Sequence, residues 1–468
     1  MAVIGGGPAG AIAARAFRRM GFHTLLIEAR GAERAVVGEA LPATTLRLLH
    51  ELGLDAAIAA ADALRCDEII QQWSGDDEIV RPTSVAMVDR NRLDRALIAT
   101  AADSGVDVIC PARLRAQTET PEGWELDIES AAGATRVTAR FLVDARGRRA
   151  AGSRLLGPSM VALCGRWRGV SFGRPQLRIA AVDDGWVWGA PLADGSFVAQ
   201  VYQRAADCAG LSPTTRAARY RATLQTTRLF SMPADAVLLD PVRARDASCR
   251  LAITPVTPRM IRIGDCCVAM DPLSSQGVQS AIRAGLRGSA VVNTILSGGD
   301  AAAAIEFYTN AVAADAARHR EASAAFYTDV AGRPSLFWRE RASAPPQPQH
   351  VPTEPLVRPL RVRLSPDARL IDHPVIERDQ VRRRPALIHP RLSEPVAFVQ
   401  GVALPSVLAP LGRVHDVSDI LAQWSSTMPP QIAQALLDWL IRHEVLLDDD
   451  LPTGPVEVAS ADPAAYHH

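Results

Sequence analysis

The sequence predicts an α/β fold with a mainly parallel N-terminal sheet, an antiparallel second sheet and a small C-terminal module. A buried strand, a glycine-rich turn, a helix and a second strand fill the first 28 residues. Apolar and polar residues alternate through much of 151–250, which is typical of an antiparallel sheet. A Pro-rich stretch begins near residue 342 and predicts a domain boundary.

These observations divide the chain into five parts. We expect one domain from 1–150 and 251–340, with 66–87 joining the sheet of a second domain at 151–250. A connector at 341–367 leads to a module at 368–450, and 451–468 form a tail.

The N-terminal turn predicts dinucleotide binding. After the strand Ala2–Ile4, the motif G-x-G-x-x-G is filled by Gly5, Gly7 and Gly10, and Pro8 and Ala9 open the helix. The first glycine allows a tight turn, the second lets the backbone approach a pyrophosphate, and the third lets helix and strand pack closely. Glu28 ends the next strand, where a ribose diol is expected. The alternative is a plain strand–helix–strand turn with a solvated acid.

Composition excludes several classes of partner. Formal net charge is zero, so we expect neither nucleic-acid nor membrane-surface binding. All 51 basic residues are Arg, and no Lys occurs. The seven Cys show no zinc-type spacing, so we expect reduced thiols in a cytoplasmic protein and no metal.

Further elements follow from local patterns. We expect a loop through Gly38–Pro42, with helices and strands after it. The helices are expected at 43–52, 214–226, 276–296, 302–328, 416–425 and 430–443, and a further helix is expected to open within 88–97. The strands are expected at 106–109, 112–118, 124–128, 136–138, 141–144, 176–182, 185–191, 196–201, 260–265, 368–371, 396–399 and 445–447.

The glycine fingerprint, the helix motif Arg90-x-x-Leu93-Asp94-x-x-Leu97 and Gly264-Asp265 together resemble the superfamily of FAD-dependent aromatic hydroxylases and flavin-dependent halogenases. The resemblance covers about residues 1–340 and implies a Rossmann-type FAD-binding domain of the aromatic hydroxylase type with an antiparallel-sheet substrate domain. It also implies that the following residues contact FAD: Gly5, Gly7, Pro8, Ala9, Gly10, Glu28, Arg90, Leu114, Gly264, Asp265, Gly277 and Val278. The helix that begins near Gly277 would aim its positive dipole at the flavin.

Three segments look most like the halogenase branch. They are Gly38–Pro42, Trp186-x-Trp188-x-x-Pro191 and Asp271–Val278. Halogenases of this kind relay hypochlorous acid through a lysine, which this sequence lacks, and an Arg guanidinium is a poor nucleophile. We therefore expect oxygen transfer from a C4a-hydroperoxyflavin to an aromatic ring. Glu39, Trp186 and Trp188 are the candidate catalytic residues, although strand packing is the alternative for the two tryptophans and a solvated loop acid for Glu39.

The C-terminal module resembles the winged-helix modules that bind precursor peptides in peptide-modifying enzymes. A lysine-free flavin monooxygenase that carries such a module is similar to the flavin monooxygenases of tryptophylquinone biogenesis. Those enzymes mature quinohemoprotein amine dehydrogenase. The resemblance implies a single-component enzyme that uses FAD, NADH or NADPH, and O2. It would hydroxylate Trp in a peptide or small protein subunit, which the C-terminal domain could dock. The module could instead stabilise the chain or dimerise.

Three rival functions remain open at this point. A halogenase would need halide and a relay, and a reductase of isoprenoid double bonds would need no O2. A non-catalytic flavin-binding scaffold would bind FAD without turning it over.

Overall fold

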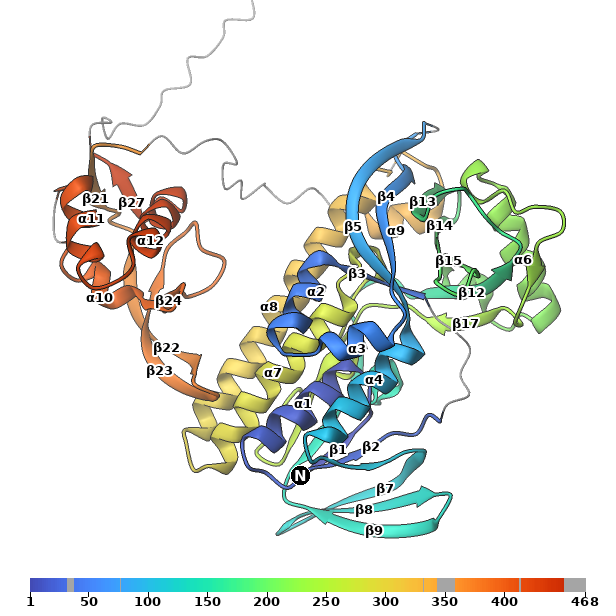
Figure 1. The fold of residues 1–468 in the computed structure, drawn as a ribbon, viewed down its shortest axis with the longest axis horizontal. Helices are drawn as coiled ribbons and strands as arrows, with labels where there is room; N and C mark the ends of the chain where they lie inside the picture. Colours follow the sequence, from blue (N-terminus) through green and yellow to red (C-terminus); the bar gives the residue numbers. More distant parts are fainter. Residues whose placement is uncertain (32–37, 76, 331, 343–357, 412–413, 450–468) are drawn as a thin grey trace, which may run out of the picture. The chain divides into compact units, whose positions relative to one another are not determined.

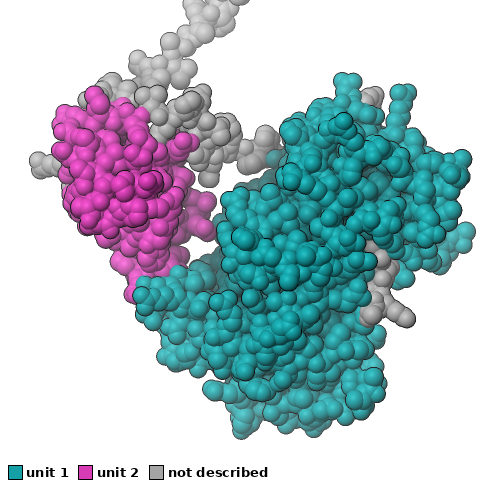
Figure 2. Space-filling model, in the orientation of Figure 1, with its two compact units in different colours: residues 1–346, 376–382 teal, residues 347–375, 383–468 magenta. Residues whose placement is uncertain are grey.

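The computed structural model describes residues 1–31, 38–75, 77–330, 332–342, 358–411 and 414–449. The chain forms two compact units (Figures 1 and 2). The first comprises residues 1–346 and 376–382, and the second comprises 347–375 and 383–468. No helix among the described residues is long and apolar enough to span a membrane.

A five-stranded parallel sheet forms the centre of the first unit. Its strands, in spatial order, are β19 (Met260–Arg262), β10 (Leu142–Asp144), β1 (Ala2–Ile4), β2 (Leu25–Ile27) and β6 (Asp107–Ile109). These strands are short and almost entirely apolar, as expected for a sheet covered on both faces. The predicted Rossmann-type core is therefore present.

Different layers cover the two faces of this sheet. One face packs against helices α1 (Pro8–Arg19), α4 (Arg90–Asp103), α7 (Gly277–Leu296) and α8 (Ala301–Thr328). The other packs against a three-stranded antiparallel sheet of β7 (Ala112–Thr120), β8 (Gly123–Ser130) and β9 (Gly133–Ala139). Alternation explains the division, because Ala2 and Ile4 join the cluster with β8 while Val3 joins the helical cluster.

Helices α1 and α7 approach each other closely (Figure 1). A Cβ atom on Gly285 would lie 2.6 Å from the carbonyl oxygen of Ala9. Only a residue without a side chain permits this contact, which brings the middle of α7 against the first turn of α1.

A nine-stranded sheet lies beside the core in the first unit. Its path runs β16 (Val237–Leu238), β12 (Met160–Arg168), β15 (Phe197–Arg204), β14 (Gly185–Pro191), β13 (Gln176–Val182), β4 (Leu64–Gln72), β5 (Ile79–Asp89) and β3 (Gly38–Pro42), and β17 (Arg243–Asp246) also pairs with β12. Neighbours run antiparallel except β13 and β4. Helix α6 (Pro213–Gln225) packs on one face, where Tyr220 and Leu224 join the cluster of Trp167 and Phe197.

The remaining elements of the first unit are short connections. They are helices α2 (Ala43–Glu51), α3 (Asp55–Ala60), α5 (Ala205–Cys208) and α9 (Leu336–Arg341), and strands β11 (Ser153–Leu155), β18 (Arg250–Ala252) and β20 (Val268–Ala269). Short 3-10 turns occur at Gly264–Cys266 and Pro272–Ser274.

The prediction of a loop at Gly38–Pro42 is wrong. These residues form the edge strand β3, which pairs with β5 in register from Gly38 opposite Asp89 to Pro42 opposite Val85. The five residues carry glycine and proline and show little alternation, so their strand conformation depends on pairing with a distant segment.

The second unit has its own apolar core. Strands β21 (Arg361–Leu364), β26 (His415–Asp416) and β27 (Leu446–Asp448) form a sheet with helices α10 (Leu404–Leu408), α11 (Val417–Ser425) and α12 (Pro430–Arg442). Two hairpins complete the described strands. One is β22 (Arg369–Glu377) with β23 (Gln380–Ile388), whose turn at 376–382 belongs to the first unit, and the other is β24 (Phe398–Val399) with β25 (Val402–Ala403). Strand β21 lies inside the predicted connector 341–367. The connector was predicted from its proline content, whereas the strand forms because its residues pair with β27. Most of that connector and all of the tail 451–468 lie outside the described residues.

Candidate functional site

The glycine-rich turn after β1 leaves open space at the N-terminus of α1. Gly5 has φ +109°, and a Cβ there would lie 2.4 Å from the carbonyl oxygen of Ala145. A Cβ on Gly10 would lie 1.9 Å from the carbonyl oxygen of Gly5, whereas a Cβ on Gly7 would meet nothing within 4 Å. Packing therefore requires the first and third glycines, and Gly7 faces space that a phosphate group could fill.

Pro8 and Ala9 begin α1 and serve that turn in different ways. Pro8 occupies the first helical turn, where its missing N–H leaves no hydrogen bond unmade. Ala9 is buried, and a Cβ on Gly264 would lie 2.8 Å from its Cβ. The glycine-rich turn and the segment around Gly264, both predicted to contact FAD, are thus in contact. The first backbone N–H groups of α1 have no partner within the helix and lie beside the open space at Gly7.

Glu28 lies directly beside this turn and is only 4% exposed. Its Oε2 accepts a hydrogen bond from the Gly6 N–H at 2.6 Å, and its Oε1 accepts from the backbone N–H and Nε of Arg30, each at 2.7 Å. Burial alone would raise the pKa of Glu28, but the hydrogen bonds and charge of Arg30 and the backbone N–H groups lower it overall. A ribose diol would have to share this carboxylate with Arg30, a residue that the glycine motif did not point to.

Two predicted residues from distant segments, Glu39 and Arg90, meet at the start of α4. Arg90 donates through Nη1 to Glu39 Oε2 at 3.0 Å and through Nε to Asp94 Oδ1 at 2.7 Å. Burial raises the pKa of Glu39, with the charges of Asp265 and Asp94 adding to it against the pull of Arg90. Burial would lower the pKa of Arg90, but the carboxylates of Asp94, Glu39 and Asp265 raise it overall. The cluster offers donors and acceptors of the kind that a polyhydroxyl chain needs.

Asp265 connects this cluster to a residue that the sequence analysis missed. Gly264 has φ +62° and opens a 3-10 turn just after β19, and Asp265 is the second residue of that turn. Asp265 Oδ2 accepts from Arg148 Nε at 3.2 Å, and Arg148 also donates to the carbonyl oxygens of Ser248 and Met270, at 2.6 Å each. The Asp265 side chain stays 38% exposed, so it retains room for a ligand. No spacing rule predicts Arg148, because its partners lie at least 100 residues away.

Helix α7 begins at Gly277, as predicted within one residue. Ser275 just before it adopts a left-handed conformation with φ +50°, and a Cβ on Gly277 would meet nothing within 4 Å. The Val278 side chain packs into the cluster of Ile12 and Leu41. The first backbone N–H groups of α7 have no partner within the helix, and no side chain at Gly277 covers them at the positive end of the helix dipole.

A buried acid precedes this helix. Asp271 accepts hydrogen bonds from the Leu273 N–H at 3.0 Å and from the Tyr327 hydroxyl at 2.9 and 3.1 Å. Burial raises the pKa of Asp271 despite these donors, and burial also raises the pKa of Tyr327 well above its ordinary value. Tyr327 lies near the end of α8, 56 residues after Asp271, so the pair links the turn before α7 to α8. Asp271 belongs to the halogenase-like segment, but the sequence does not show its partner.

Aromatic side chains gather behind Asp271. Trp186 stacks on Tyr202 with ring centroids 3.7 Å apart and 9° between planes, and it meets Trp73 edge-on at 6.5 Å. Trp338 meets Trp73 at 5.6 Å and donates from Nε1 to the carbonyl oxygen of Val182.

Trp186 is 1% exposed, so its contacts fit the packing alternative rather than contact with a substrate. Trp188 is half-buried on the same sheet face and lies against two apolar clusters, which leaves it a candidate.

One predicted contact is not brought near the others. Leu114 packs under the parallel sheet with Leu25 and Ile109, in the cluster that contains Trp124. None of the contacts described for its side chain involves another predicted FAD residue. Its proposed role therefore stays a prediction.

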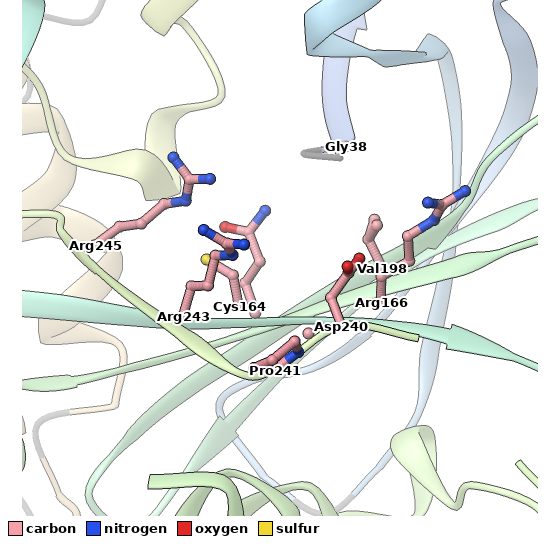
Figure 3. A pocket seen from close by; sticks show the side chains of 10 residues that line it. Gly38, Cys164, Arg166, Val198, Asp240, Pro241, Arg243 and Arg245 are labelled. Carbon is pink, nitrogen blue, oxygen red and sulfur yellow. The ribbon is translucent and has the colours of Figure 1, made fainter. Parts of the chain in front are cut away.

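A pocket of about 360 Å³, counted with the space open to solvent, lies on the nine-stranded sheet (Figure 3). Gly38 lines it from β3, and Arg243 and Arg245 line it from β17. The other lining residues are Cys164, Gly165, Arg166, Val198, Gln200, Asp240 and Pro241. Gly38 precedes Glu39, so the pocket borders the strand that carries the Arg90 partner. Among the residues described, no three His, Cys, Asp or Glu side chains form a group that could hold a metal ion.

Comparison with known proteins agrees with this geometry. Residues 1–232 match the family described as FAD binding domain. The chain is 28% identical over 365 residues to tryptophan 2-halogenase of Chondromyces crocatus, covering 72% of this chain and 69% of that protein.

Two solved structures match nearly the whole chain. The peptidyl tryptophan dihydroxylase QhpG, essential for tryptophylquinone cofactor biogenesis, is 28% identical, with a TM-score of 0.74 over 94% of this chain and 98% of that one. The flavin-dependent halogenase CmlS has a TM-score of 0.78 over 95% of both chains at 17% identity, which shows a shared fold alone.

The residues present fit an FAD group, since the open turn at Gly7, the acid–arginine cluster at Arg90 and the free helix start at Gly277 lie on one FAD-binding fold. The fold is that of the aromatic hydroxylases and flavin halogenases. The chain therefore belongs to the superfamily of FAD-dependent monooxygenases and flavin halogenases, and it is a flavin-dependent oxidoreductase.

Proposed function

We propose that this chain is a single-component monooxygenase that hydroxylates an aromatic side chain, namely Trp in a peptide or small protein subunit during tryptophylquinone biogenesis. The observation that carries the proposal is the absence of lysine from the 468 residues, because the related halogenases relay their oxidant through that residue. The similarity to a peptidyl tryptophan dihydroxylase over 94% of the chain supports the substrate class.

The reaction balances with O2 and a nicotinamide. One oxygen atom enters an aromatic C–H bond, which becomes C–OH, and the other leaves as water. NADH or NADPH gives two electrons and a proton comes from solvent. Bound FAD would receive those electrons and activate O2.

The chain's own residues bind and position the reactants in this proposal. The N–H groups at Gly7 and the carboxylate of Glu28 would hold the nucleotide end of FAD, and Arg90 and Asp265 would hold its polar chain. The start of α7 at Gly277 would stabilise negative charge on the flavin ring. The Asp271–Tyr327 pair fixes the turn before α7, and the aromatic sheet face excludes water from the reacting ring.

The C-terminal unit has a role of its own in this proposal, which is to dock the peptide. Its folded core of fifteen buried side chains could support such a surface. Hydrogen exchange of the full chain with and without a Trp peptide tests this role. We expect added protection within 368–450, and protection confined to 1–340 would reject it.

Halide dependence separates the proposed function from its main rival. The FAD-loaded protein is given NADH or NADPH, O2 and a Trp-containing peptide, with and without chloride or bromide, and the product mass is measured. We expect a gain of one or two oxygen atoms, equal in all salts. A halogen in the product would reject the proposal and favour a halogenase, which the similarity to a tryptophan 2-halogenase keeps as the second candidate. Turnover without O2 would indicate a reductase, and bound FAD without turnover a scaffold.

A further inference from the structure

Strand pairing places arginines and tryptophans in the same rows of the nine-stranded sheet. Directly paired residues of neighbouring strands point to the same face. The first row consists, in order, of Arg243, Cys164, Gln200 and Trp188. The second row consists, in order, of Arg245, Ala162, Tyr202 and Trp186. The rows share one face because their members are two residues apart on each strand. This face therefore has an arginine end and a tryptophan end.

The opposite face is covered, so the arginines project away from it. Gly165 follows Cys164 on β12 and therefore faces the other side of the sheet, where its Cβ would be 2.6 Å from the hydroxyl oxygen of Tyr220 on α6. Arg243 and Arg245 instead extend into the pocket, across from Gly38 (Figure 3). The pocket is thus continuous with the face that carries Trp188.

The pocket has an excess of positive charge. Arg166 forms an ion pair with Asp194, but among the described residues neither Arg243 nor Arg245 forms one with a carboxylate. Asp240 is the one acid among the ten lining residues, so it offsets only one of the two arginines.

The Cys164 thiol does not neutralise the positive charge of the pocket, and one arginine donor there is unpaired. Burial raises the pKa of the Cys164 thiol to about 11, which keeps it neutral near pH 7. The Nε atom of Arg245 is buried without a hydrogen-bond partner among the residues described. An unpaired buried donor favours a ligand that accepts hydrogen bonds.

The spacing of the rows limits what such a ligand can be. Three interstrand steps separate the Arg243 backbone from that of Trp188, or roughly 14 Å. Arg243 can reach back along the row, so a ligand that contacts both ends of this face must carry its carboxylate at some distance from its aromatic ring. An acidic side chain near the target aromatic residue of a peptide provides such a separation, and the α-carboxylate of the same residue provides a shorter one.

We propose that Arg243 and Arg245 bind a carboxylate of the aromatic substrate, so that the enzyme selects an aromatic ring with an acidic group beside it. The inference rests on the proposed function, because it names the substrate class of that same site. The carboxylate has two chemical sources, an Asp or Glu side chain near the target Trp of a peptide, or the α-carboxylate of a free amino acid.

Peptide binding tests this subsite without turnover. Fluorescent peptides with one Trp and one Glu at each position from three before to three after it are titrated against the oxidised, FAD-loaded full chain. Matched peptides carry Gln in place of Glu. We expect one Glu peptide to bind about 10- to 100-fold more tightly than its Gln match, the range for a charge-assisted hydrogen bond. Arg243→Gln and Arg245→Gln should each reduce that preference, and the double variant should abolish it.

A control variant and a free amino acid complete the experiment. Arg174→Gln removes an exposed arginine of the same domain outside the pocket and should leave the preference unchanged. If free tryptophan competes as well as the best peptide and loses this ability in Arg243→Gln, the carboxylate is the α-carboxylate. If no peptide shows a Glu preference and free tryptophan does not bind, or if the variants keep the preference, the subsite is rejected. If the Glu preference behaves as expected but the unchanged protein, given NADH or NADPH and O2, hydroxylates none of the peptides, the proposed function is rejected and the subsite is retained.

Discussion

The FAD-binding part and the substrate sheet of the first unit are built from different kinds of contact. At the FAD-binding turn, backbone atoms and small residues do the work, since Gly5, Gly10 and Gly264 each occupy positions that a Cβ would obstruct. On the substrate sheet, large side chains meet across strands far apart in sequence, as Trp186 does with Tyr202 and Trp73. A site built from backbone atoms needs small residues at a few positions of the sequence, whereas a site built from side chains depends on which strands pair.

The largest expected effect lies in the substrate sheet. Trp186→Ala should lower the free energy of unfolding by about 3–5 kcal/mol, because it empties a fully buried aromatic position. Trp188→Ala should cost clearly less, since Trp188 is half-buried. Urea unfolding of the two FAD-loaded variants measures both values. Equal losses would mean that Trp186 is not the packing centre of the cluster.

Two glycine variants test the backbone-built site. Gly10→Ala should destabilise the protein by about 1–3 kcal/mol, since its Cβ would overlap the carbonyl oxygen of Gly5. Gly7→Ala should leave the melting temperature of the FAD-free protein unchanged and weaken FAD binding at least tenfold, because its Cβ enters only open space. Calorimetry and FAD titration separate the two effects. A destabilised Gly7→Ala or an FAD affinity that does not change would contradict this assignment.

Two buried acids of the first unit should respond to pH in opposite directions. Glu28 has a pKa below its ordinary value of 4.5, so it stabilises the folded state above that pH, and this contribution is lost as the pH falls through the folded-state pKa. Asp271 has a pKa above its ordinary value of 3.8, so stability falls as the pH rises from there through the folded-state pKa.

Two variants make this contrast measurable. Relative to the unchanged protein, Glu28→Gln should become less stable as the pH rises through the acid range, and Asp271→Asn should become more stable. Unfolding free energies measured from about pH 3 to pH 8 provide the comparison. If the unfolding free energies of both variants, relative to the unchanged protein, change with pH in the same direction, the environment described for Glu28 or for Asp271 is wrong.

The same contrast explains what could be predicted from the sequence. The strand–glycine–helix unit, α7 and α8 were predicted within one or two residues, because each depends on local apolar periodicity and on glycine spacing. Strand β3 was missed because its conformation comes from pairing with β5. Arg148, Tyr327 and the Arg243–Arg245 pocket were missed for a related reason, since each acts through partners brought together only by the fold.

Labelling with isotopically heavy oxygen gas tests the central claim most directly. The FAD-loaded protein, NADH or NADPH and a Trp peptide react under heavy O2 in ordinary water with chloride present, and tandem mass spectrometry locates the label. The account predicts heavy oxygen on the Trp ring at every hydroxylated position and no chlorine. Chlorine on the ring, or oxygen that derives from water, would contradict the assignment of this lysine-free chain as a monooxygenase.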